Sequence, residues 1–138
     1  MAGFTDLLRQ RGRVYLLEAV VCFGSLVVLL GLGLIALPLA FSAEGDNVFG
    51  WQLVAMLGGG FVGLWGVTQL VLKVAYPARQ VASPRAIVST LLLGIGALLL
   101  FYQWLLLSRA ATLTLVVLPL LGTAHFLFLG RDYLVRQR

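Results

Sequence analysis

The stretch AVVCFGSLVVLLGLGLIALPLAFSA, residues 19–43, carries no charged side chain and decides the fold. A helix rises about 1.5 Å per residue, so about 20 uncharged residues cross a hydrocarbon core of about 30 Å. The apolar part of this stretch is far longer than the about 7–15 residues of a secretory signal peptide, and no clear A-x-A site closes it. We therefore predict a retained transmembrane helix.

Three further uncharged runs have the same character: 47–72, 86–108 and 110–130. The 138 residues are 61% hydrophobic and 11% charged, whereas soluble domains are about 45–50% apolar and about 25% charged. We predict an all-α integral membrane protein with a single domain, residues 1–138, whose four transmembrane helices form two antiparallel hairpins. The helices are expected over about residues 14–41, 50–75, 85–107 and 111–131.

Two local patterns refine this arrangement. Phe4, Leu7 and Leu8 fall on one helical face ahead of the first span, which predicts a short N-terminal interfacial helix. Only residues 108–111 separate the third and fourth spans. Because such a short connection joins antiparallel neighbours, we expect the last two spans to pack tightly against each other.

The basic residues are sorted unevenly among the connections. Nine of the ten fall on one side of the predicted spans, and only Arg109 falls on the other: Arg9, Arg11, Arg13, Lys73, Arg79, Arg85, Arg131, Arg136 and Arg138. Short segments rich in Lys and Arg stay in the cytoplasm, so we expect both termini inside, in an inner (plasma) membrane of bacterial type. The net charge of +5 then favours contact with anionic lipid headgroups and not nucleic acid.

The hexapeptide GGGFVG, residues 58–63, matches the G-x-G-x-x-G pattern of dinucleotide-binding loops. That motif needs an acidic residue about 20 positions later, and the chain has no Asp or Glu between Asp46 and Asp132. We interpret the glycines as a packing surface, because small residues let transmembrane helices approach closely. The predicted stripe on the second helix contains Ala55, Gly59, Gly63 and Gly66.

The first helix is the expected partner of this stripe. In a hairpin that turns near Gly45, residues whose numbers add to about 91 lie at equal depth. Ser25 would then face Gly66, and Leu32 would face Gly59. Other small residues are left to serve a partner protein: Gly94 with Ala97, or Gly24 with Gly31.

The same register sets Glu18 opposite Lys73, an acid and a base at matching depth. We consider a structural ion pair, a proton or cation site, and contact with headgroups as alternative roles. His125, the only histidine, lies at a comparable depth in the fourth span. It is expected to form an interhelical hydrogen bond or, alternatively, to join Glu18 and Lys73 in a proton relay.

The chain is poor in catalytic and metal-binding chemistry. One His, one Cys and one membrane-embedded Glu do not form a recognisable set of three or four metal ligands. No nucleophile has a base and an orienting partner at a motif spacing, and Cys22 is interpreted as a small buried hydrophobe. We expect no catalytic residues, no metal and no cofactor.

Two functions follow from this inventory. The first is a non-enzymatic accessory subunit that packs against another membrane protein, or against its own copies, through Gly-rich faces. The alternative is a small oligomeric transporter or channel with Glu18 as its coupling group and with Gln69, Lys73 and His125 lining the cytoplasmic half.

Overall fold

The computed structural model describes the backbone of residues 2–42, 47–104 and 109–135, and the side chains of residues 10–42, 47–103 and 110–135. All regular elements in these segments are helical: α1 (Ala2–Ser42), α2 (Val48–Ala75), α3 (Pro84–Trp104), α4 (Arg109–Thr112), the π-helical segment η1 (Leu113–Val117), α5 (Leu118–Leu129) and α6 (Arg131–Val135). Four segments are long and apolar enough to cross a membrane: Gln10–Ser42, Val48–Ala75, Pro84–Gln103 and Ala110–Leu129. We call the last of these, formed by α4, η1 and α5, the fourth span.

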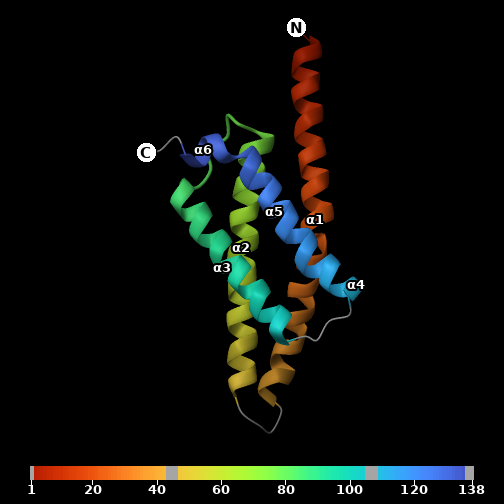
Figure 1. Cartoon of the computed structure of the whole chain (residues 1–138), viewed down its shortest axis with the longest axis vertical. Helices are drawn as coiled ribbons and strands as arrows, with labels where there is room; N and C mark the ends of the chain where they lie inside the picture. The colour runs from red at the N-terminus through yellow and green to blue at the C-terminus, as the bar shows by residue number, and fades with distance from the viewer. Residues whose placement is uncertain (1, 43–46, 105–108, 136–138) are drawn as a thin grey trace.

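The four spans form two layers. In Figure 1, α1 and α2 stand side by side, and α3 and the fourth span cross them at an angle. The N-terminus, α6 and the connection between α2 and α3 all lie at one end of the molecule. We call this the basic end, because the described segments there hold seven basic residues: Arg9, Arg11, Arg13, Lys73, Arg79, Arg85 and Arg131.

Helix α1 runs without a break from Ala2 to Ser42. The segment expected to form a separate interfacial helix is therefore the first part of α1, and it extends beyond the other helices at the basic end (Figure 1). Pro38 lies inside α1 close to its end and does not terminate the helix. Proline is tolerated in transmembrane helices when neighbouring groups satisfy the backbone.

Prolines and a capping serine set the limits of the connection between α2 and α3. The N–H of Tyr76 still donates to the carbonyl of Leu72, at 2.9 Å, but Pro77 has no N–H to continue the helix. Pro84 occupies the first position of α3, which suits its fixed φ. Just before it, the hydroxyl of Ser83 accepts the N–H of Ala86 at 3.4 Å.

The packing departs from two self-contained hairpins. α3 packs chiefly on α2, and the fourth span packs chiefly on α1. In the described parts of the chain, α3 and α5 share no extended contact, so the expected tight pairing of the last two spans is wrong. Gly94 and Ala97 of α3 face α2, and small residues determine where transmembrane helices approach closely.

The fourth span is not a regular α-helix. The N–H of Leu118 donates to the carbonyl of Leu113, five residues back, at the end of η1. Pro119 follows and has no N–H, so it cannot hold the carbonyl four residues earlier in an α-helical bond. From α1, the hydroxyl of Ser25 donates to the carbonyl of Thr114 at 3.3 Å. A π-turn of this kind is often found at functional sites.

Fully buried side chains from three spans belong to one apolar cluster near the basic end. Leu70, Ile87 and Phe126 come from α2, α3 and α5 and have no exposed surface. The rings of Phe23 and Phe126 are tilted against each other, with centroids 6.5 Å apart. These side chains close the bundle at this depth.

Candidate functional site

Glycines make the backbones of α2 and α3 meet. A Cβ atom added to Gly94 would lie 2.6 Å from the Cα of Gly63, closer than real Cβ atoms approach. A Cβ on Gly59 would lie 2.9 Å from the Cβ of Ala97, and one on Gly66 would strike the hydroxyl of Thr90. We call these six residues the glycine seam. Only Gly permits this separation, because any side chain at Gly63 or Gly94 would meet backbone.

The stripe predicted on α2 therefore has a different partner from the expected one. Its glycines face α3 and not α1, and Ala55 at its end stays exposed. Ser25 does not face Gly66, because its hydroxyl bonds to the fourth span. Residues 58–60 are three successive glycines, each turned about 100° from the last. Composition alone could not tell which of them faces which helix.

Helix α1 meets a neighbouring face of α2. A Cβ on Gly60 would lie 2.6 Å from a methyl of Leu30, and one on Gly33 would lie 2.6 Å from a methyl of Leu57. In both contacts the residue numbers add to 90, against the expected sum of about 91. The depth at which the helices meet is thus close to expectation, while the face differs.

Glu18 contacts His125. Its Oε1 lies 3.5 Å from Nε2 of the histidine, with the two side chains 34% and 50% exposed respectively. The contact joins α1 to α5 on the side of α1 that also carries Cys22, one turn further along and packed against Gly122. The contact is an ion pair when the imidazole carries a proton.

The expected pairing of Glu18 with Lys73 is wrong. The ammonium of Lys73 donates instead to the carbonyls of Pro77, at 2.7 Å, and Arg79, at 3.2 Å. It also lies 4.8 Å from the centroid of the Tyr133 ring. Because the last carbonyls of a helix and the loop beyond it lack intrahelical partners, a lysine in the last turn can reach them. Lys73 thus holds the connection between α2 and α3.

Two more side chains support the same connection. The side-chain oxygen of Gln69 accepts the N–H of Ala82 at 3.3 Å. From α6, the hydroxyl of Tyr133 donates to the carbonyl of Ala82 at 2.9 Å. Gln69 and Lys73 are therefore engaged by the connection and do not lie with Glu18 and His125.

The described side chains include no group of three or more His, Cys, Asp or Glu that could hold a metal ion. Cys22 is buried, 9% exposed, among the apolar side chains of the core. Among the described side chains of the spans, the contact between an acid and a possible base is the one between Glu18 and His125. It places no hydroxyl or thiol nucleophile beside the imidazole.

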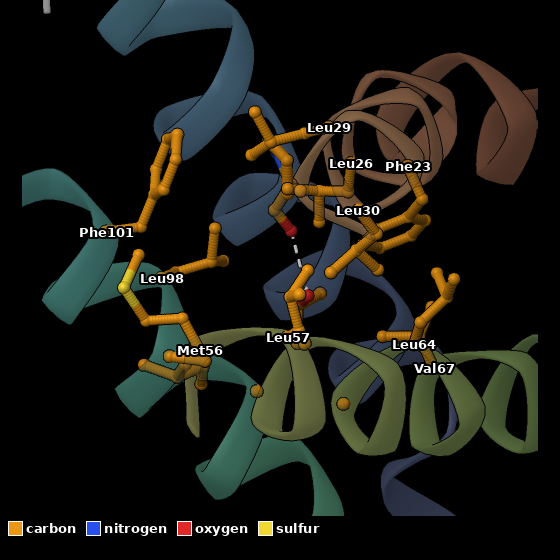
Figure 2. Close-up of a pocket in the computed structure, with 18 of the residues that line it drawn as sticks. Phe23, Leu26, Leu29, Leu30, Met56, Leu57, Leu64, Val67, Leu98 and Phe101 are labelled. Carbon is orange, nitrogen blue, oxygen red and sulfur yellow. Dashed lines mark hydrogen bonds between the residues drawn. The ribbon is translucent and has the colours of Figure 1, made fainter. Parts of the chain in front are cut away.

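A cavity of about 280 Å³ lies between the layers, and we call it the central pocket. Its lining residues come from α1, α2, α3 and the start of α5. Figure 2 shows the apolar side chains that define it: Phe23, Leu30, Met56, Leu57, Leu98 and Phe101. Among the lining residues that the structure describes, Thr123 is the only one with a polar side chain, and its hydroxyl donates to the carbonyl of Pro119 at 2.8 Å.

Sequence analysis did not identify this pocket. Its lining is apolar except for Thr123, and apolar side chains in a membrane protein are equally typical of lipid-facing surface. The pocket exists because α3 and the fourth span rest on different helices of the first layer. No local pattern of residues in the sequence predicts which of these helices pack on each other.

Some glycines remain uncovered. A Cβ added to any of four glycines would find no described atom within 4 Å: Gly24, Gly31, Gly58 and Gly96. The first two lie seven residues apart on α1, and so on one face of that helix.

Comparison of the chain with protein-family models, with curated proteins and with solved structures found no match.

Proposed function

We propose that the protein is a non-enzymatic accessory subunit of the membrane that binds another membrane protein through α1. The observation that carries this proposal is the uncovered state of α1 within the chain. Only 17% of its most hydrophobic window is buried, the lowest share among the four spans. On this helix Gly24 and Gly31 have open space around them.

The physical reason lies in how helices associate in lipid. The acyl chains are as apolar as leucine, so burial from water does not drive helices together, and close packing relies on small residues. Within this chain the glycine seam illustrates such packing. The face of Gly24 and Gly31 offers the same surface to a helix from outside.

The location proposed is the inner (plasma) membrane, with both termini in the cytoplasm. It is supported by the uneven sorting of basic residues along the sequence and by the seven described basic residues in segments at the basic end (Figure 1). Gly3→Cys and Gln137→Cys, each in a Cys22→Ala chain, should react with a membrane-impermeant maleimide only after the cells are opened. Labelling of either cysteine in intact cells would contradict the orientation.

The function is tested by gentle extraction from native membranes followed by measurement of the mass of the complex. We expect a complex heavier than the 14.9 kDa chain. Gly24→Leu with Gly31→Leu should return the chain to a monomer, because leucine side chains keep a partner helix away from α1. The matched control is Gly96→Leu, which alters an equally open glycine on α3 and should leave the mass unchanged. A monomeric native protein, or equal loss of the complex in the control, would refute the proposal.

A second function, proton- or cation-coupled transport, is favoured by one observation, the Glu18–His125 contact. A carboxylate in a transmembrane helix is costly and usually paired or functional. The other residues expected to line such a path, Gln69 and Lys73, bind the connection between α2 and α3. If Glu18→Gln leaves ion flux in reconstituted vesicles unchanged, transport loses its coupling group.

A further inference from the structure

We infer that the central pocket is a binding site for one acyl chain of a membrane phospholipid. This site is independent of the accessory role proposed above, since it lies between the layers and not on the face of Gly24 and Gly31.

The apolar lining of the central pocket favours a hydrocarbon ligand. Leu, Phe, Met, Val, Ile, Ala, Gly and Pro form all of the described lining except Thr123. The hydroxyl of Thr123 already donates to the carbonyl of Pro119 at 2.8 Å. A buried water needs two to four polar partners, and this pocket offers too few. A charged or strongly polar ligand would leave its own groups unsatisfied there.

The volume of the pocket matches a segment of a hydrocarbon chain. An apolar cavity of about 150 Å³ accommodates benzene, so by proportion the cavity of about 280 Å³ holds on the order of ten carbon atoms. The pocket therefore fits a segment of an acyl chain.

The position of the pocket gives such a chain access. Its lining runs from Phe23 to Ala36 on α1 and from Leu53 to Val67 on α2, the middle parts of their spans. Towards the basic end the pocket is closed by the packed side chains around Phe126. Away from it, Leu32 and Ala36 line the pocket yet remain exposed. A chain can thus enter sideways from the bilayer.

Phospholipid is the source that this geometry favours. Acyl chains are the medium around the spans at this depth, so they reach the opening without any carrier. An empty pocket would forfeit dispersion contacts along its whole lining, and an acyl chain restores them. Once inside, the chain is held by four spans and exchanges more slowly than lipid on the outer faces.

The location is tested by photolabelling. The protein is reconstituted with a phosphatidylglycerol that carries a diazirine in the middle of one acyl chain. It is then extracted into detergent, freed of loose lipid by gel filtration, and irradiated. We expect adducts on Met56, Leu98 and Phe101. The matched control is Leu99, which neighbours Leu98 but is 54% exposed and does not line the pocket. Adducts confined to outward residues such as Leu99, or no adducts at all, would overturn the site.

A variant pair tests the requirement for space. Ala36→Phe places a ring in the pocket, whereas Ala124→Phe adds the same ring to an exposed position outside it. Native mass spectrometry should find one phospholipid on the wild type and on Ala124→Phe, and at least tenfold less on Ala36→Phe. Equal retention by both variants, or a retained isoprenoid instead of a phospholipid, would overturn the proposal. The photolabelling needs no variant, so it decides the question even if Ala36→Phe fails to fold.

Discussion

Replacing Gly94 by alanine tests the reasoning about the glycine seam directly. The new Cβ would lie 2.6 Å from the Cα of Gly63, and ordinary van der Waals contact begins at 3.4 Å. The atom that it meets is backbone, so no side chain can turn aside, and α2 and α3 must separate by about 0.8 Å. Because α2 meets α3 along the whole seam, this separation also loosens the contacts of Gly59 and Gly66. Overpacking of this kind costs about 1–3 kcal/mol.

Gly96→Ala is the matched control on the same helix. Gly96 lies two residues further along α3, and a Cβ there would meet no described atom within 4 Å. The substitution changes helix propensity in the same way, by about 0.5–1 kcal/mol in favour of alanine, but adds no clash. The propensity gain is common to both variants and cancels between them. We therefore expect the free energy of unfolding to be lower in Gly94→Ala than in Gly96→Ala by the overpacking cost alone, about 1–3 kcal/mol.

The assay is reversible unfolding in mixed micelles with increasing SDS, followed by circular dichroism. The two variants are measured beside the wild type under identical lipid conditions. Gly94→Ala should unfold at a lower SDS fraction than the wild type, and Gly96→Ala at the same or a higher one. If the two variants unfold together, α2 and α3 do not approach as closely as Gly63 and Gly94 indicate, and the seam is not a source of stability.

Three further substitutions have distinct expected results. Tyr133→Phe removes the hydrogen bond to the carbonyl of Ala82 and should lower the free energy of unfolding by about 0.5–1.5 kcal/mol; an unchanged value in the SDS titration would show that the bond contributes nothing. Lys73→Met removes the donor for two carbonyls of the α2–α3 connection, so limited proteolysis should cut that connection faster. An unchanged cutting rate would show that Lys73 does not hold the connection. Glu18→Gln keeps an acceptor near His125 in a partly exposed contact, so the free energy of unfolding should shift by less than about 1 kcal/mol; a larger loss would mean that the carboxylate is buried more deeply.

The partner of Glu18 could not be predicted from the sequence. Glu18 is at a depth that both Lys73 and His125 can reach along their own helices, so distance along the chain could not choose between them. The choice came from the fourth span lying on α1, which brings His125 to Glu18. Lys73 donates instead to carbonyls of the α2–α3 connection that follows it. Pairing acidic with basic residues by depth does not predict such bonds to the backbone.

The sequence by itself determined that this chain has four helices able to cross a membrane, because a segment without charges is the one kind that hydrocarbon accepts at low cost. It also indicated that glycines on α2 belong to close packing, since only small residues let backbones meet. Only the tertiary structure decided that those glycines meet α3, that Glu18 meets His125, and that a pocket lies between the layers. The physical reason is that lipid and protein interiors are equally apolar, so hydrophobic pattern does not mark which face of a transmembrane helix is covered.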